Sequence, residues 1–270
     1  MTPIVVKDTT GKPLYKIVNQ WYRTNKDYTQ GFKVLKTGKV LESTGEYGKS
    51  RIQILDIDNC TGEVKRSVNT KKLKTKYFGE GTDLIKLNDG NRYVFQLTWQ
   101  ERAILVYSYP ALTRLGKITI PSQISQGWGF SHDTKTGTIF ITDGTSKVFT
   151  CKASKLGSKF SLNCDNGKVV MYNGQPQNSL NELEFKDGIL YMNIYLHNNI
   201  MGLNINSWKI VKNYNMSYLR NIANNRMQQV YHKQLEGGEV LNGITWNPMK
   251  NCWMLTGKDW PVVFCLQWLQ

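Results

Sequence analysis

The feature that most constrains this chain is a pattern that recurs five times along it. Each copy consists of a polar or aromatic residue, a small or polar residue, and then a short apolar strand. The copies are Gln30-Gly31-Phe32, Glu80-Gly81-Thr82, Trp128-Gly129-Phe130, Asn181-Glu182-Leu183 and Asn242-Gly243-Ile244. Their first residues are 50, 48, 53 and 61 positions apart. A repeat of this length, built from several strands, is typical of one blade of a β-propeller.

Short apolar runs rich in Val, Ile, Tyr and Phe make up most of the remaining sequence. Turn residues separate these runs, as in Asn88-Asp89-Gly90 and Lys186-Asp187-Gly188. This pattern indicates many short antiparallel strands. Helical periodicity is nearly absent, and the one candidate helix, around Tyr218 to Lys233, is weakly patterned. We therefore predict an all-β fold, and more specifically a five-bladed β-propeller.

The chain of 270 residues has a suitable length for one large all-β domain. We predict a single propeller domain over residues 1–270. An apolar run at residues 15–22 precedes the first repeat, and another at residues 262–268 follows the last. Pairing of these two runs would close the ring and remove its exposed sheet edges. A β-sandwich or a two-domain all-β protein is the alternative that the strand pattern leaves open.

The chain is strongly basic, since 35 Lys and Arg residues against 20 Asp and Glu leave a net charge of +15. Such a surface can attract nucleic acids, anionic membranes or acidic peptides. Much of the excess lies in residues 65–76, which we interpret as a solvated loop between two strands. No nucleic-acid motif accompanies the charge, so we predict no nucleic-acid partner. No apolar run is long enough to predict a membrane-spanning segment.

Five cysteines and three histidines are present, and no two cysteines form a CxxC pair. A zinc site built from these residues is therefore not expected. Cys151 and Cys164 flank a short polar segment and could form a disulfide, although the odd count is compatible with free thiols as well. Residues 1–13 lack the long apolar core of a signal peptide, which leaves the cellular compartment open.

Equivalent positions of a propeller repeat face one another across a central channel. The first residues of the five copies are Gln30, Glu80, Trp128, Asn181 and Asn242. The strands that follow contribute Trp99, Tyr195 and Lys258 near their ends. One carboxylate, one ammonium, three amides and several aromatic rings are thus predicted to line one mouth of the channel.

Each of these residues, taken alone, has a purely structural interpretation. A Glu before Gly is usually a solvated turn residue, and a Trp usually belongs to the core. An Asn at a strand end usually bonds to nearby backbone. The recurrence of these residues at matching positions favours a shared functional site, but it does not name a reaction.

At these positions the chain resembles the plant and bacterial type of glutaminyl-peptide cyclotransferase, also called glutamine cyclotransferase. The resemblance rests on short motifs in a fixed order between residues 28 and 265. They are Tyr28-Thr29-Gln30-Gly31-Phe32, Glu42-Ser43-Thr44-Gly45, Tyr47-Gly48, Phe78-Gly79-Glu80-Gly81, Gln96-Leu97-Thr98-Trp99, Gly127-Trp128-Gly129, Leu180-Asn181-Glu182-Leu183-Glu184, Leu241-Asn242-Gly243-Ile244, and Thr256-Gly257-Lys258 followed by Trp260-Pro261. Each motif is weak alone, but the ordered series is specific.

The resemblance implies a five-bladed propeller that converts the N-terminal glutamine of peptides or proteins to pyroglutamate, with release of ammonia and without a metal or cofactor. It also implies that Glu80 is the catalytic acid and base. The implied substrate-binding residues are Tyr28, Gln30, Trp99, Trp128, Asn181, Tyr195 and Lys258. The family suggests the secretory pathway, and we expect a monomer.

Two implied pocket residues depart from the usual family pattern. The family commonly has Phe in place of Tyr28, which is a mild change. It commonly has Trp in place of Tyr195, and the smaller ring alters the expected shape of the pocket wall and thereby the substrate preference.

Two other functions are compatible with the sequence pattern. Calcium-dependent propeller hydrolases, such as lactonases, also place Glu and Asn residues around a central channel. Glu80, Asn181 and Asn242 could imitate that set, although Trp128 and Lys258 leave little room for a cation. The second alternative is a non-catalytic propeller used as a binding scaffold. The zinc-dependent α/β type of glutaminyl cyclase is excluded because the chain lacks an alternating α/β pattern.

Overall fold

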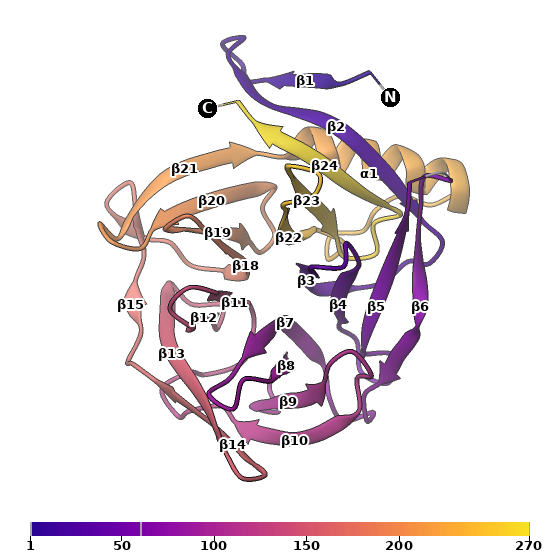
Figure 1. The fold of residues 1–270 in the computed structure, drawn as a ribbon. Coiled ribbons are helices and arrows are strands. Elements are labelled where there is room, and N and C mark those ends of the chain that lie inside the picture. Colours follow the sequence, from indigo (N-terminus) through magenta and orange to yellow (C-terminus); the bar gives the residue numbers. More distant parts are fainter. Residues whose placement is uncertain (1, 60, 270) are drawn as a thin grey trace.

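The computed structural model describes residues 2–59 and 61–269. Within these residues the chain forms many strands and one helix, α1 (Ser217–Tyr231). The sheets surround a common centre, which gives the molecule a propeller-like arrangement (Figure 1). The expected all-β fold is therefore confirmed.

The largest sheet has nine strands. In spatial order they are β22 (Leu241–Asn247), β23 (Cys252–Gly257), β24 (Val262–Trp268), β2 (Pro13–Arg23), β6 (Glu63–Lys72), β5 (Arg51–Asp58), β4 (Val40–Thr44) and β3 (Thr29–Val34), and β1 (Ile4–Lys7) pairs with β2. This sheet therefore combines segments from both ends of the chain.

Three further sheets occupy the middle of the sequence. The first contains β7 (Gly79–Lys86), β8 (Arg92–Thr98), β9 (Ala103–Ser108) and β10 (Arg114–Thr119). The second contains β11 (Phe130–Asp133), β12 (Thr138–Thr142), β13 (Lys147–Leu156), β14 (Lys159–Cys164) and β15 (Lys168–Val169). The third contains β18 (Leu180–Lys186), β19 (Ile189–Ile194), β20 (Asn199–Asn204) and β21 (Lys209–Asn215). A short hairpin, β16 (Met171–Tyr172) and β17 (Gln175–Pro176), precedes β18.

The strands nearest the centre are β3, β7, β11, β18 and β22 (Figure 1). Each of them contacts the next, and β22 contacts β3, so that these inner strands form a closed series. Most of their residues are buried, whereas the outer strands β14 and β21 alternate between covered and exposed positions. The inner strands nevertheless carry buried polar and charged residues, such as Asp83, His132 and Glu184, so burial rather than an apolar sequence distinguishes them from the outer strands.

Strand β2 connects the two ends of the described chain. It pairs antiparallel with β24, where Tyr15 lies opposite Trp268. Its last residues pair in parallel with the start of β6, where Tyr22 lies opposite Glu63. An N-terminal segment thereby joins β22–β24 to the strands β3–β6.

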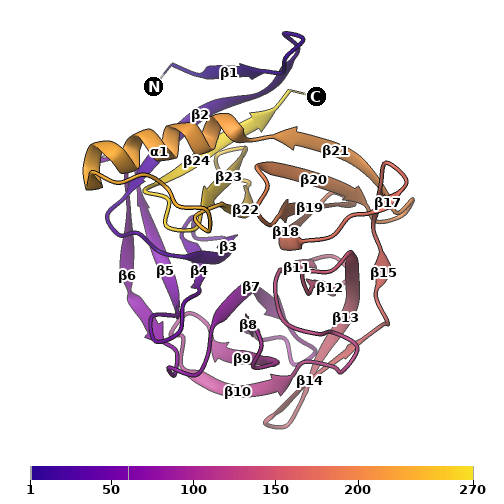
Figure 2. The same cartoon turned by 180° about the vertical axis from the view of Figure 1, so that it is seen from behind.

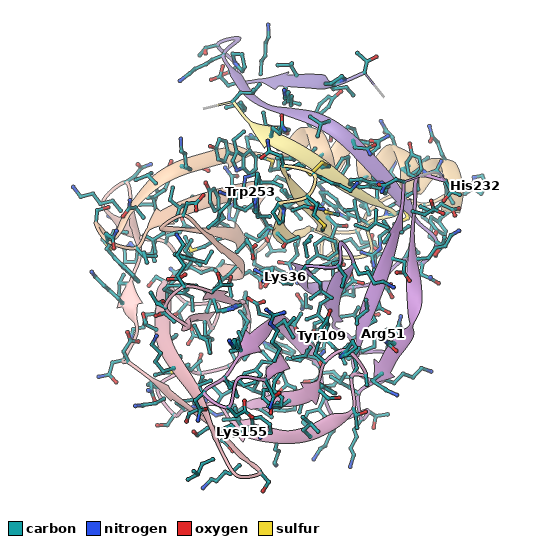
Figure 3. The ribbon with its side chains drawn as sticks, viewed as in Figure 1. Lys36, Arg51, Tyr109, Lys155, His232 and Trp253 are labelled. Carbon is teal, nitrogen blue, oxygen red and sulfur yellow. A yellow bond between two sulfur atoms is a disulfide. The ribbon has the colours of Figure 1, made fainter. Side chains whose placement is uncertain are left out.

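The candidate helix corresponds to α1, and its bounds differ from the predicted ones by one or two residues. Its buried residues Leu219, Ala223 and Met227 lie four positions apart and therefore share one face. The helix ends at Tyr231, and the next residue, His232, adopts a left-handed conformation. It lies against β24 on the outside of the molecule (Figure 2). Both His232 and Lys155 lie at the outer edge of the ring (Figure 3).

Two disulfides connect neighbouring strands. One joins Cys151 to Cys164, the pairing that the sequence left open, and the other joins Cys252 to Cys265. The fifth cysteine, Cys60, lies outside the described residues.

The interpretation of residues 65–76 as a loop is wrong for the first part of that stretch. Residues up to Lys72 belong to β6, which pairs with β5 along its length. Backbone pairing therefore decides the local structure despite the density of Lys side chains. The exposed side chains of Lys71, Lys72, Lys74 and Lys76 agree with the predicted solvation.

Candidate active site

The predicted site residues come from two kinds of position. Gln30, Glu80 and Asn181 lie at the starts of inner strands. Trp99 and Tyr195 directly follow the second strands β8 and β19. Because these strands are antiparallel, the start of the first lies beside the end of the second, as Gly79 lies opposite Thr98 and Leu180 opposite Ile194. Lys258, which follows β23, forms an isolated antiparallel bridge with Tyr28. Strand pairing therefore brings both kinds of residue to the same end of the ring.

Four of the five inner strands, β3, β7, β18 and β22, begin with an interruption of the ladder. The register shifts between Thr29 and Gly31, between Gly79 and Thr82, between Leu180 and Leu183, and between Leu241 and Ile244. These intervals contain Gln30, Glu80, Asn181 and Asn242. A β-bulge re-aims a side chain that regular pleating would direct elsewhere, and bulges are frequent next to active sites.

The glycines of the repeat permit close packing of the inner strands. A Cβ atom on Gly31 would lie 2.5 Å from the backbone nitrogen of Thr82, and one on Gly81 would lie 2.6 Å from that of Phe130. The Gly81 N–H instead donates a hydrogen bond to the carbonyl of Trp128 at 2.8 Å. Glycine is therefore required at positions 31 and 81, because neighbouring inner strands approach closely there.

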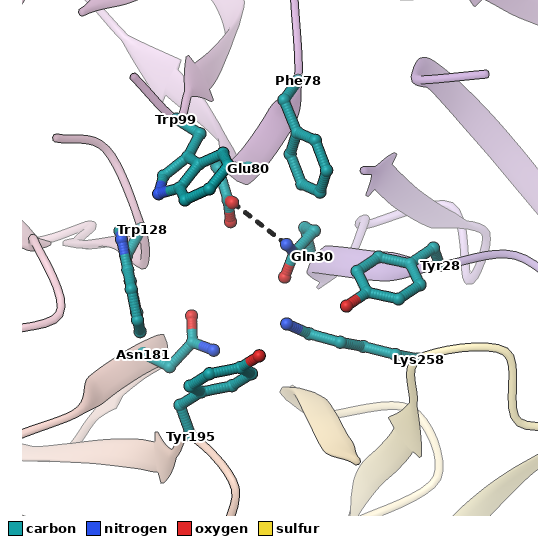
Figure 4. Close-up of a pocket in the computed structure, with 9 residues that line it drawn as sticks. All are labelled: Tyr28, Gln30, Phe78, Glu80, Trp99, Trp128, Asn181, Tyr195 and Lys258. Carbon is teal, nitrogen blue, oxygen red and sulfur yellow. Dashed lines mark hydrogen bonds between the residues drawn. The ribbon is translucent and has the colours of Figure 1, made fainter. Parts of the chain in front are cut away.

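One pocket of about 230 Å³ brings the predicted residues together (Figure 4). Its lining residues are Tyr28, Gln30, Phe78, Glu80, Trp99, Trp128, Asn181, Tyr195 and Lys258. All eight site residues that the resemblance implies are among them, whereas Asn242 is not. The volume equals that of roughly seven or eight liquid water molecules, which suits one amino-acid side chain with its adjoining backbone.

Phe78 is the lining residue that the sequence analysis missed. It belongs to the motif Phe78-Gly79-Glu80-Gly81, but an aromatic residue before a strand is usually interpreted as part of the core. Its ring lies 5.5 Å from that of Trp99 and 6.2 Å from that of Tyr28, between centroids. The position two residues before Glu80 was the available signal, because Tyr28 stands in the same relation to Gln30.

Aromatic rings form most of the pocket wall. On the side opposite Phe78, the rings of Trp128 and Tyr195 meet edge to face with centroids 5.5 Å apart. This geometry is the preferred one for neighbouring aromatic rings. The result is a largely apolar enclosure around a small number of polar groups, as in most small-molecule sites.

Glu80 is the one carboxyl group that lines the pocket, and it is 4% exposed. Gln30 donates a hydrogen bond from Nε2 to Glu80 Oε1 at 3.0 Å. Burial raises the pKa of Glu80 well above its usual value of 4.5, while the positive charge of Lys258 opposes this rise. A carboxyl group with a pKa raised in this way holds its proton to a higher pH than an exposed one, as catalytic acids and bases often do.

Lys258 is 3% exposed, and its ammonium group lies between two phenol rings. The Nζ atom lies 4.5 Å from the centroid of the Tyr195 ring and 5.0 Å from that of Tyr28. Burial lowers the pKa of Lys258 to about 8, although the Glu80 carboxylate favours the charged form. Burial also raises the pKa of Tyr28 above its usual value of 10.

Two buried polar atoms of the pocket lining have no hydrogen-bond partner within the described part of the chain. One is the indole Nε1 of Trp128, a donor, and the other is Oδ1 of Asn181, an acceptor. Buried polar atoms are usually hydrogen-bonded, so this pair offers complementary positions to a bound molecule.

Asn242, the remaining residue of the first column, does not line the pocket. It is fully buried and donates hydrogen bonds from Nδ2 to Gln30 Oε1 at 3.1 Å and to the Thr29 carbonyl at 3.0 Å. Asn242 therefore lies outside the pocket and contacts Gln30, which does line it.

The described residues contain no group of three or more His, Cys, Asp or Glu side chains arranged to hold a metal ion. In the same residues, no helix has the length and apolar character needed to cross a membrane.

Comparisons with known proteins agree on one family. The sequence profile of the glutamine cyclotransferase family matches residues 4–268. A glutaminyl-peptide cyclotransferase of Arabidopsis thaliana is 28% identical over 243 residues, which cover 88% of this chain and 66% of the plant protein. The crystal structure of a Myxococcus xanthus glutaminyl cyclase has a similar fold, with a TM-score of 0.73 and 23% identity, over 93% of this chain and 95% of that one.

Proposed function

Because this chain belongs to the glutamine cyclotransferase family, we propose that it converts the N-terminal glutamine of peptides or proteins to pyroglutamate and releases ammonia. The observation that most directly supports this proposal is the pocket around Glu80, in which a single buried carboxyl group is surrounded by aromatic rings. One such group can serve both proton transfers that the reaction requires.

The reaction is an intramolecular acyl transfer, in which the α-amine attacks the γ-carboxamide carbon. The amine is largely protonated at neutral pH and must lose a proton, whereas the amide nitrogen must gain one before it leaves as ammonia. Glu80 takes the first proton and delivers the second. General acid and base catalysis of this kind contributes about 10²- to 10⁴-fold to a rate.

The two unpartnered atoms of the pocket suit the γ-carboxamide of the substrate. A primary amide has a carbonyl oxygen that accepts hydrogen bonds and an NH₂ group that donates them. Trp128 Nε1 can donate to that oxygen, and Asn181 Oδ1 can accept from that nitrogen. A glutamate side chain, when ionised, has no donor for Asn181.

Negative charge develops on the γ-carbonyl oxygen as the ring closes. Gln30, Asn181 and Lys258 are the candidate donors to this oxygen, and Gln30 already donates from Nε2 to Glu80. We assign this role chiefly to Lys258, since an ammonium in an aromatic enclosure stabilises an oxyanion strongly. A preorganised donor typically lowers such a barrier by about 3–4 kcal/mol.

The aromatic walls hold the glutamine methylenes in the folded conformation needed for ring closure. Trp99, Trp128 and Tyr195 are the residues to which we assign this role. Orientation of reacting groups can contribute several kcal/mol to a rate enhancement.

We further propose that the five inner strands correspond to five blades of a single domain, closed by the pairing of β2 with β24. We also propose that the protein acts as a monomer and that catalysis needs no metal. Size-exclusion chromatography with light scattering tests whether the protein is a monomer.

Dialysis against a chelator tests whether catalysis needs a metal. Activity that is lost on dialysis and then restored by Ca²⁺ would overturn the metal-free mechanism.

Incubation of the protein with a Gln-initiated peptide tests the proposed function. We expect the peptide to lose the mass of one ammonia, and the Glu80→Gln variant to serve as the matched negative control. A folded wild-type protein that leaves the peptide unchanged would contradict the proposal and favour a binding scaffold.

A further inference from the structure

The amide groups of Asn242 and Gln30 connect three inner strands. Asn242 of β22 donates from Nδ2 to Gln30 Oε1 of β3 at 3.1 Å. Gln30 in turn donates from Nε2 to Glu80 Oε1 of β7 at 3.0 Å. Asn242 is fully buried and Gln30 is 3% exposed, so water has little access to this chain of hydrogen bonds.

The direction of these hydrogen bonds is set by a backbone group. The carbonyl of Thr29 can only accept, so the Asn242 side chain must turn its NH₂ group toward it, at 3.0 Å. The same NH₂ group then faces Gln30, which must present Oε1 in return. The oxygen and the nitrogen of an amide point in different directions. When Oε1 of Gln30 faces Asn242, Nε2 of Gln30 therefore faces Glu80.

We propose that Asn242 is a positioning residue, which fixes through Gln30 the end of the amide that meets Glu80. This inference rests on the proposed function, in which Glu80 is the catalytic base and acid. Asn242 itself does not line the pocket, so we expect it to act on Glu80 only through Gln30.

The orientation of Gln30 matters because it distinguishes the two forms of Glu80. A donated N–H stabilises the carboxylate, whereas a carbonyl oxygen in its place would stabilise the protonated acid. Burial already raises the pKa of Glu80. A hydrogen bond donated by Gln30 favours the carboxylate and so acts against that rise, which favours the form of Glu80 that accepts the proton of the substrate amine.

Other charged or titratable groups also act on Glu80, and the test must separate them from Gln30. Lys258 lowers the pKa of Glu80 and Glu101 raises it. Tyr28 and Tyr47 are also within electrostatic range of the carboxyl group. None of these four residues is changed in the variants below.

The first variant is Asn242→Leu, which keeps the shape of the side chain but cannot donate a hydrogen bond. Asn193→Leu is the matched control, since Asn193 is equally buried and accepts a hydrogen bond from the backbone N–H of Gly243 at 3.2 Å. Both variants lose one buried amide beside the same stretch of β22. Only the first disturbs Gln30.

The readout is the pKa of Glu80, followed by ¹³C NMR of the glutamate carboxyl carbons and assigned by the signal that Glu80→Gln removes. We expect a rise of about one unit in Asn242→Leu, in line with the loss of one hydrogen bond to a charged group. We expect no comparable rise in Asn193→Leu. An unchanged pKa in Asn242→Leu, or an equal rise in both variants, would overturn the proposal.

A double-mutant cycle with Gln30→Met tests whether Asn242 acts through Gln30. In the Gln30→Met background, Asn242→Leu should shift the pKa of Glu80 no further. An undiminished second shift would show that Asn242 acts directly. If the Leu variants do not fold, Asn242→Ala and Asn193→Ala replace them, because a smaller side chain causes no overpacking.

The NMR titration requires no turnover, so it separates this inference from the proposed function. If the wild-type protein fails to cyclise a Gln-initiated peptide, the proposed function is wrong, while the titration still decides the role of Asn242. If the protein is active, the acidic limb of the pH profile of kcat/KM should move upward in Asn242→Leu and not in Asn193→Leu.

Discussion

Glu80 and Lys258 line the same pocket, and each changes the protonation of the other. Burial raises the pKa of Glu80 and lowers that of Lys258 to about 8, while the attraction between the two charges opposes both shifts. Their proton affinities are thereby brought closer together than those of an exposed Glu and Lys. A pocket with this property can give and accept protons within a narrow range of pH.

Replacement of Glu80 tests the assignment of the catalytic group. Glu80→Gln should retain the fold and the binding of a Gln-initiated peptide, because the side-chain shape is nearly unchanged. Turnover should fall by about 10²-fold or more, since an amide cannot shuttle a proton. Steady-state kinetics with circular dichroism as the folding control measure this. Near-normal turnover in a folded variant would refute the assignment.

The pH dependence of kcat/KM should be bell-shaped. Activity should rise as Glu80 ionises, and the midpoint of this acidic limb should lie above pH 4.5 because burial raises the pKa of Glu80. Activity should fall as Lys258 loses its proton, with a midpoint near pH 8.

Lys258→Arg assigns the basic limb of that profile. Arginine keeps its charge to a pH above about 12, so the basic limb should move upward or disappear. The peptide is the same in both measurements, and its own α-amine titration therefore cancels in the comparison. A basic limb that stays in place would show that Lys258 is not the group responsible.

Substrate specificity should follow from the chemistry of the pocket. We expect turnover of Gln-initiated peptides with small or bulky second residues. We expect little or no action on N-terminal Glu at neutral pH and none on N-acetylated Gln, because the free amine is the nucleophile and ammonia is the leaving group. Mass spectrometry of four such peptides measures this, and rapid turnover of the acetylated peptide would exclude the amine-nucleophile mechanism.

Tyr195 is the pocket residue that departs most from the family pattern. Its ring already meets Trp128 edge to face and lies under the ammonium of Lys258. Tyr195→Trp should therefore add aromatic contact and tighten peptide binding by about 1 kcal/mol without loss of turnover. KM and kcat for one Gln-initiated peptide test this. A large loss of activity would mean that the pocket is built around tyrosine.

The two disulfides offer a matched comparison of stability. Both connect cysteines 13 positions apart, so the loop-closure contribution should be alike, at about 3 kcal/mol each. Cys252 and Cys265 are both buried, whereas Cys164 is partly exposed. Replacement of Cys252 and Cys265 by Ala should therefore reduce the free energy of unfolding more than replacement of Cys151 and Cys164, as measured by urea denaturation. The reverse order would contradict this.

The spacing of the repeat predicted most of the side chains that share the pocket, whereas Tyr28 was assigned from the family resemblance. Gln30, Glu80 and Asn181 occupy equivalent positions, and antiparallel pairing places Trp99 and Tyr195 beside them. The sequence did not reveal the bulges at the starts of the inner strands, because a register shift depends on the partner strand. The repeat therefore assigned Asn242 to the same column as Glu80. It did not predict that Asn242 lies outside the pocket and contacts Gln30 instead.

The local environment of single residues was harder to predict than the arrangement of the repeats. Phe78 was missed because hydrophobicity alone does not distinguish a pocket wall from a core. Residues 65–76 were assigned to a solvated loop because of their positive charge, whereas the residues up to Lys72 pair with β5. The lowered pKa of Lys258 depends on burial by several sheets, and a single motif does not encode it.

The pairing of β2 with β24 also has a consequence during protein synthesis. The ribosome produces β2 before almost every other strand described here and β24 after all of them, so β2 must wait for its principal partner. At typical elongation speeds of about 5–20 residues per second, this delay lasts many seconds. Until β24 emerges, the nascent chain exposes an unpaired strand edge, which is prone to aggregation and is a natural target for chaperones.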